Sequence, residues 1–85
     1  MFTVYIIKSL KVKRYYVGVA EDVSDRIAQH NQGKVRSTKA FTPYKLIHTE
    51  SFQTLSQARA QESKIKRSGH IERYLKNFMA LSSNG

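Results

Sequence analysis

The sequence predicts an α+β domain in which a three-stranded antiparallel sheet is flanked by helices, in the order β-β-α-β-α-α. Two segments rich in β-branched and aromatic residues lie close together near the start of the chain, and a third lies near its middle. The remaining apolar residues recur at the three- and four-residue spacing of amphipathic helices. Because the apolar faces of a sheet must be covered, we expect these helices to pack against it.

The first two strands are expected over residues 2–8 and 14–20, joined by a polar turn at residues 9–13. Strands this close in sequence pair as an antiparallel hairpin. Both faces of the first strand are largely apolar, with Thr3, Tyr5 and Ile7 on one side and Val4 and Ile6 on the other. We therefore expect this strand to be central and covered on both sides.

Helix one is expected over residues 22–31, with Glu21 or Asp22 as its N-cap and a stop at residues 31–33. Val23 and Ile27 lie four residues apart and form its core stripe, whereas Asp22, Arg26 and His30 recur at the same spacing on another face. Residues 34–43 form a basic loop without apolar periodicity.

The third strand is expected over residues 45–52, where two sets of residues alternate. One set contains Leu46, His48, Glu50 and Phe52, and the other contains Lys45, Ile47, Thr49 and Ser51. A capping box at residues 54–57 begins helix two, which carries Leu55, Ala58, Glu62 and Ile65 on one stripe.

A third helix, over residues 71–81, is expected to bury Ile71, Leu75 and Phe78. At 85 residues, the chain is long enough for one domain. We expect that domain to span residues 1–81 and to be followed by a disordered tail, residues 82–85.

Net charge is the strongest signal in the composition. Fifteen Lys and Arg residues oppose six Asp and Glu residues, which gives a formal charge of +9. A small domain with this imbalance attracts polyanions, of which nucleic acid is the commonest, although an acidic lipid or an acidic protein partner would also fit. The basic side chains expected to contact nucleic acid are Lys34, Arg36, Lys39, Lys64, Lys66 and Arg67.

Several classes of site are missing from the sequence. It contains no cysteine, no glycine-rich phosphate loop, no paired carboxylates and no zinc-ligand spacing. The apolar runs are too short for a membrane span, and the start of the chain lacks the basic region and cleavage site of a signal peptide. These patterns predict a cytoplasmic protein without membrane association.

Glu62 stands among the basic residues Arg59, Lys64, Lys66 and Arg67. An ordinary interpretation is a helix-surface glutamate in local ion pairs. However, Glu62 also lies on the stripe of Ala58 and Ile65, near the edge of the expected buried face. A carboxylate in a positive field suits a hydrated Mg²⁺ ion, which uses one or two carboxylates together with water and phosphate oxygens.

Tyr5 and Tyr16 on adjacent expected strands are a second candidate feature. They are either core aromatics with hydroxyls at the sheet edge or a functional pair. Arg26 and His30 are a third feature, either on a solvated helix face or as a donor pair directed at a phosphate.

Taken together, these residues resemble the GIY-YIG nuclease superfamily, and in particular its small stand-alone members. Thr3-Val4-Tyr5 and Tyr16-Val17-Gly18 are similar to the paired motif that names the family. Other similar segments are residues 26–31 on helix one (Arg, then Gln-His-Asn), residues 42–46 before the third strand and residues 58–67 around Glu62.

The resemblance implies an endonuclease that hydrolyses phosphodiester bonds with one divalent ion, Mg²⁺ or Mn²⁺, bound by Glu62. Either Tyr5 or Tyr16 would help to generate the nucleophile, and the resemblance does not choose between them. Arg26 would stabilise charge on the phosphoryl oxygens, and His30 would share the base role or orient the water. Gly18 would leave space beside the site, and Asn31 would serve a structural role.

DNA is expected rather than RNA as the partner, including structured or damaged DNA in repair or recombination. An alternative is a basic module that binds DNA or RNA without cutting it. The sequence departs from the family pattern at Thr3, which replaces glycine, at Val17, which replaces isoleucine, and at Val19, where some members carry lysine. Asn77 is the candidate for the family's late asparagine.

Overall fold

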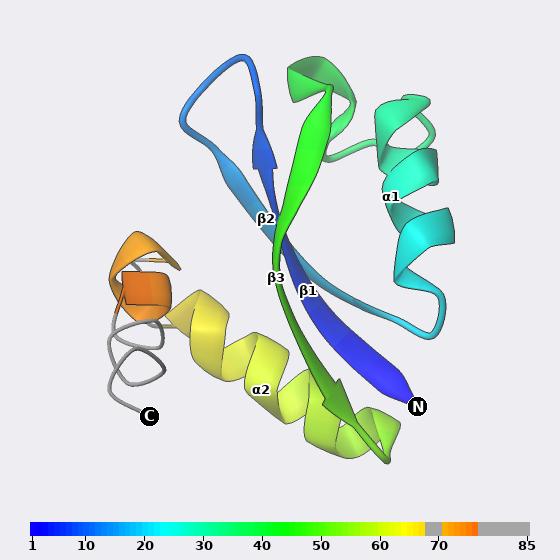
Figure 1. The fold of residues 1–85 in the computed structure, drawn as a ribbon, viewed down its shortest axis with the longest axis vertical. Coiled ribbons are helices and arrows are strands. Elements are labelled where there is room, and N and C mark those ends of the chain that lie inside the picture. Colours follow the sequence, from blue (N-terminus) through cyan, green and yellow to red (C-terminus); the bar gives the residue numbers. More distant parts are fainter. Residues whose placement is uncertain (68–70, 77–85) are drawn as a thin grey trace.

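The computed structural model describes residues 1–67 and 71–76, and its centre is the predicted antiparallel sheet (Figure 1). The strands are β1 (Phe2–Ser9), β2 (Tyr15–Ala20) and β3 (Tyr44–Phe52), arranged in the order β2-β1-β3. The prediction that the first strand is central is therefore confirmed. The strand bounds differ by one residue from those expected at the start of β2, at the start of β3 and at the end of β1.

The helix α1 (Val23–Asn31) covers one face of the sheet. Asp22 caps it, because its side chain accepts a hydrogen bond from the amide of Asp25 at 3.0 Å. After the helix, Gly33 adopts a φ of +76°, a conformation that ends helices readily and that side chains with a Cβ disfavour. The predicted stripe of Val23 and Ile27 packs against the cluster of Tyr5, Ile7, Ala20 and Tyr44.

The helix α2 (Leu55–Arg67) covers the opposite face, as the two separate core clusters show. Thr54 accepts a hydrogen bond from the amide of Gln57 at 3.2 Å, as the expected capping box requires. Ala58 and Ile65 are buried against Val4, Ile6 and Val17. Leu55, in the first turn of the helix, is 41% exposed, so the buried part of the stripe begins at Ala58.

A bulge in β3 breaks the predicted alternation of its side chains. Ile6 is paired with His48 and Ile7 with Leu46, so that Ile47 between them has no partner on β1. An extra residue in one strand changes the face to which the following residues point. Ile47 therefore packs on the α2 side together with Phe52, rather than on the opposite side from it.

A polar network on the α2 side ties three segments together. Glu50 on β3 accepts hydrogen bonds from Gln61 on α2, at 3.1 Å, and from the hydroxyl of Tyr74. Gln61 also donates to the Tyr74 hydroxyl at 2.8 Å, and His48 lies 2.8 Å from Glu50. Burial, followed by the hydrogen bond with Glu50, raises the pKa of Tyr74 to about 12, so this hydroxyl stays protonated and keeps donating.

Residues 71–76 are helical, as expected for the start of the third helix, and Ile71 and Leu75 pack against the α2-side cluster. The rest of that predicted helix, including Phe78, and the expected tail over residues 82–85 lie outside the described residues.

Candidate active site

Tyr5 and His30 form the centre of the site. Both side chains are buried, and the Tyr5 hydroxyl lies 2.9 Å from Nε2 of His30. On the other side of the ring, Nδ1 of His30 lies 2.7 Å from the hydroxyl of Thr38. The Thr38 hydroxyl donates its proton to the carbonyl of Val35, so it accepts one from Nδ1. His30 is therefore the Nδ1-protonated tautomer, and its Nε2 accepts the hydrogen bond from Tyr5.

Electrostatics favour the neutral form of both groups. Burial, and next the nearby Arg26, lowers the pKa of His30 below its usual 6.5. Burial also raises the pKa of Tyr5 well above its usual value, and negative charge on Tyr16 or Glu62 raises it further, whereas Arg26 lowers it. Tyr5 thus remains a protonated donor at neutral pH, facing a neutral imidazole.

The lowered pKa of His30 makes stability depend on pH. In the unfolded chain this imidazole takes up a proton near pH 6.5, whereas the folded protein resists protonation to a lower pH. The contribution of His30 to the free energy of unfolding should therefore be complete above about pH 6.5 and lost as the pH falls through its folded pKa. Urea titrations from pH 7.5 to 5 should show a steeper loss in wild type than in His30→Gln, and parallel curves would contradict this.

Tyr16 on β2 is the more accessible of the two tyrosines. Its ring is half-buried and meets that of His30 edge-on, with centroids 4.7 Å apart, and its centroid lies 6.2 Å from that of Tyr5. The predicted pair thus lies together beside His30. Of the two, Tyr16 is the one that water and a substrate can reach.

Gly18 lies opposite Tyr5 in the hairpin. A Cβ atom at this position would lie 2.6 Å from the Tyr5 hydroxyl oxygen and 2.7 Å from Cζ of the same ring. These separations are well below van der Waals contact, so a side chain at position 18 would displace the tyrosine. The space that the sequence interpretation assigned to Gly18 is filled by Tyr5.

The four-residue spacing of Arg26 and His30 placed their side chains on one face of the helix. In the structure the two side chains do not share a face. Arg26 is exposed on α1, whereas His30 points inward to Tyr5. The arginine makes no ion pair with a carboxylate among residues 1–67 and 71–76. Its charge nevertheless reaches the site, because it lowers the pKa of both Tyr5 and His30.

Glu62 lies on α2, which covers the opposite face of the sheet from the Tyr5–His30 pair. Its carboxylate is 17% exposed and lies 3.4 Å from Nζ of Lys66 and 4.0 Å from Arg59. It is close enough to Tyr5 to raise the pKa of that hydroxyl.

The part of the chain that the structure describes contains no cluster of three or more His, Cys, Asp or Glu side chains around Glu62 or elsewhere. A single accessible carboxylate fits Mg²⁺ or Mn²⁺, which complete their shells with water and phosphate oxygens, and it does not fit an ion that needs a full set of protein ligands.

The remaining predicted residues are the basic candidates for nucleic-acid contact and Asn77. The six basic candidates are all exposed, three between α1 and β3 and three at the end of α2: Lys34, Arg36, Lys39, Lys64, Lys66 and Arg67. Only Lys66 among them makes an ion pair within the described ranges, with Glu62. The expected counterpart of the late asparagine, Asn77, lies outside those ranges.

Asn31 joins the end of α1 to the start of β3. Its side-chain oxygen accepts a hydrogen bond from the amide of Tyr44 at 2.7 Å, and its nitrogen donates to the carbonyl of the same residue at 3.2 Å. This pair of bonds fixes the helix turn that carries His30. Sequence reasoning missed Thr38, because a threonine in a basic loop gives no sign that it will meet a histidine eight residues earlier.

Comparisons with known proteins agree with this geometry. A family model described as the GIY-YIG catalytic domain matches residues 1–77. A UPF0213 protein of Halobacterium salinarum is 45% identical over 53 residues, which cover 61% of this chain and 69% of the relative. One from Staphylococcus saprophyticus is 39% identical over 64 residues, covering 74% and 77% respectively.

The solution NMR structure of a UPF0213 protein from Bacillus halodurans covers 95% of this chain and 85% of its own, with 28% identity and a TM-score of 0.54. Among the described residues, no helix is long and apolar enough to cross a membrane. With its paired tyrosines, inward histidine and helix-borne glutamate, and with a family match over most of its length, the chain belongs to the GIY-YIG family.

Proposed function

We propose that this protein is an endonuclease that hydrolyses phosphodiester bonds in nucleic acid, with DNA preferred to RNA, and that it acts in the cytoplasm on structured or damaged DNA. The observation that carries the proposal is the hydrogen bond from Tyr5 to Nε2 of His30, with Thr38 fixing the tautomer. This arrangement places an oriented, neutral imidazole behind a pair of tyrosines in a strongly basic domain. Such a combination suits proton transfer near a phosphate.

We assign contact with the attacking water to Tyr16. Tyr5 is only 2% exposed, whereas the Tyr16 ring reaches the surface. Burial, and next negative charge on Tyr16, raises the pKa of Tyr5. When one member of a close pair must stay protonated, burial selects Tyr5 for that role. Tyr16 is then the member whose hydroxyl oxygen contacts the attacking water, and Tyr5 and His30 position it.

Arg26 would bind the phosphate oxygens. It is exposed, it is unpaired with any carboxylate in the described ranges, and its positive charge acts on both Tyr5 and His30. A guanidinium in this position offers two parallel donors to a phosphate and stabilises the negative charge that develops during hydrolysis.

Glu62 would hold the divalent cation, Mg²⁺ or Mn²⁺, with water and the substrate's phosphate completing the shell. When bound, the cation supplies Lewis acidity and stabilises the leaving oxygen. Lys66, now 3.4 Å from the Glu62 carboxylate, is exposed and can move aside to contact the nucleic-acid backbone.

The test compares wild type with Glu62→Gln on plasmid DNA, branched DNA and structured RNA, each with Mg²⁺, Mn²⁺ or EDTA. Wild type should cleave at least one DNA substrate with a metal, and both EDTA and Glu62→Gln should reduce the rate by about a hundredfold or more. Circular dichroism checks that the variant is folded. If wild type cleaves no substrate faster than Glu62→Gln does, while it still binds nucleic acid, the proposal of a nuclease is rejected.

That same outcome would favour the second candidate, a module that binds nucleic acid without cutting it. The observations in its favour are the net charge of +9 and the exposure of all six basic candidates. It predicts affinity that falls as salt increases and does not depend on Glu62.

A further inference from the structure

The turn between β1 and β2 is unusually well fixed for an exposed hairpin tip. The buried Ser9 hydroxyl donates to the carbonyl of Phe41 at 2.6 Å and accepts from the amides of Lys11, at 3.1 Å, and Val12, at 3.2 Å. The amide of Leu10 bonds to the carbonyl of Pro43 at 2.9 Å. These bonds hold the turn against the loop that precedes β3, so its lysines are presented from a rigid backbone.

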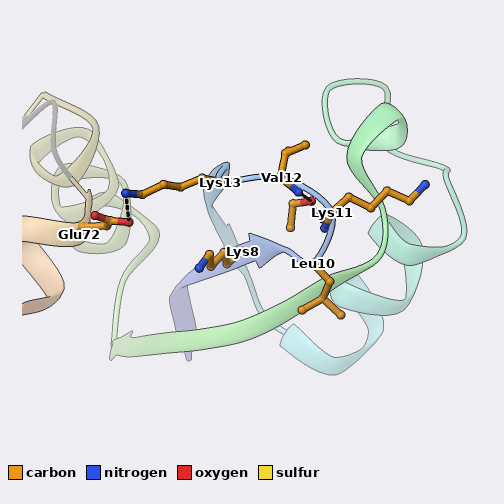
Figure 2. A pocket seen from close by; sticks show the side chains of 7 residues that line it. Lys8, Leu10, Lys11, Val12, Lys13 and Glu72 are labelled. Carbon is orange, nitrogen blue, oxygen red and sulfur yellow. Dashed lines mark hydrogen bonds and ion pairs between the residues drawn. The ribbon is translucent and has the colours of Figure 1, made fainter.

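Two donors on this hairpin, Lys13 and Tyr15, bind one carboxylate, that of Glu72. Figure 2 shows Lys13 extending toward Glu72, with Lys8 on the same side of the hairpin and Lys11 pointing away. Nζ of Lys13 lies 3.2 Å from Oε1 of Glu72, and the Tyr15 hydroxyl donates to the same oxygen at 2.8 Å. Lys8 lies with its Nζ 5.8 Å from the centroid of the Tyr15 ring. The hollow between these groups is open to solvent.

The donors stabilise an anion in this hollow. The hydrogen bonds from Tyr15 and from Lys13 hold the pKa of Glu72 below its usual value, and the positive charges of Lys13 and Lys8 act in the same direction. Two ammonium groups and a phenol hydroxyl are also the groups that bind the unbridged oxygens of a phosphodiester. Both members of the Lys13–Glu72 pair are largely exposed, so the carboxylate is weakly held.

We propose that this hairpin hollow, lined by Lys8 and Lys13 and adjoined by the Tyr15 hydroxyl that binds Glu72, is a second phosphate-binding site for the nucleic-acid strand beside the cleavage position, and that Glu72 occupies it when no nucleic acid is bound. The location rests on the proposed function. Lys8 pairs with Tyr15 on β2, and Tyr15 packs against the α2-side cluster. The hollow therefore lies on the face of the sheet that α2 covers, and α2 carries Glu62, the proposed ligand of the cation. A nucleic-acid strand held at that cation can continue along this face to the hollow.

The experiment measures binding of a labelled DNA duplex and of an RNA hairpin in EDTA, where the proposed cleavage cannot proceed. The variants are Glu72→Gln, Lys13→Gln and, as a matched control, Glu21→Gln. Glu21 is exposed just after β2, at the end of that strand away from the hairpin, and its substitution changes the net charge as Glu72→Gln does. Thermal unfolding confirms that each variant is folded.

Glu72→Gln should bind about 3- to 10-fold more tightly than Glu21→Gln at low salt, because the competing carboxylate is removed from the hollow. Lys13→Gln should bind more weakly, with the slope of log affinity against log salt shallower by about 0.9 on duplex DNA. Equal tightening in Glu72→Gln and Glu21→Gln would mean that net charge alone acts, and it would overturn the proposal. No change in Glu72→Gln and Lys13→Gln would also overturn it, and would direct attention to an acidic protein partner.

These results separate the second site from the nuclease. Altered binding in Glu72→Gln and Lys13→Gln without metal-dependent cleavage in wild type would support the second site and reject catalysis. Cleavage by wild type that depends on Glu62, with unaltered binding in both hairpin variants, would do the reverse.

Discussion

Gly18→Ala should destabilise the protein by about 3 kcal/mol and remove cleavage activity. The new methyl group would begin 2.6 Å from the Tyr5 hydroxyl oxygen, so either the ring or the β2 backbone must move. Both possibilities break the Tyr5–His30 hydrogen bond, which is 2.9 Å long in the native arrangement. Urea denaturation measures the loss of stability, and the DNA substrate that wild type cleaves best measures the loss of activity.

A double-mutant cycle with Tyr5→Leu identifies the cause. Leucine is shorter than tyrosine and has no hydroxyl group, so it leaves space for the methyl group at position 18. Adding Gly18→Ala to Tyr5→Leu should then cost less than about 1 kcal/mol, since two substitutions in direct contact are not additive. Strictly additive losses would show that the glycine is needed for another reason, and a wild-type stability in Gly18→Ala would reject the close contact itself.

Tyr16→Phe should reduce kcat by about a thousandfold while leaving stability and KM close to wild type. The hydroxyl of Tyr16 makes no hydrogen bond with any other residue that the structure describes, so its removal leaves no buried partner unsatisfied. Tyr5→Phe should have the opposite profile. It removes the donor to Nε2 of the buried His30, which should cost about 1–3 kcal/mol of stability, and it should reduce kcat less.

Stability and kcat measured together distinguish the two roles. A Tyr5→Phe variant that is as stable as wild type but loses as much kcat as Tyr16→Phe would transfer the water contact to Tyr5.

The order of the elements could be predicted because each depends on a local pattern. Apolar residues on both faces of residues 2–8 require a central strand, and Thr54 with Gln57 marks a helix start whatever the rest of the fold does. The bulge at Ile47 could not be predicted, because an extra residue changes the register without changing the composition of the strand.

The candidate site shows the same limit. Four-residue spacing groups His30 with Arg26, but His30 also lies three residues after the half-buried Ile27, and only packing decides whether its ring faces the solvent or the sheet. Thr38 and Glu72 meet their partners across 8 and 57 residues, which no periodicity records. The choice of Tyr16 over Tyr5 depends on burial, and burial is a property of the assembled sheet.

Tyr5 lies in the strand whose amide hydrogens should exchange with solvent most slowly. β1 is hydrogen-bonded to a strand on each side and is packed on both faces. Within it, Tyr5 lies between Val4 and Ile6, whose side chains are fully buried. Amides in such a strand exchange with solvent only when the whole domain unfolds, unlike those of edge strands and loops, which open in smaller fluctuations. Tyr5, which helps to orient the proposed chemistry, therefore belongs to the slowest-exchanging part of the molecule, whereas the exposed side chains proposed to bind phosphate belong to its faster-exchanging periphery.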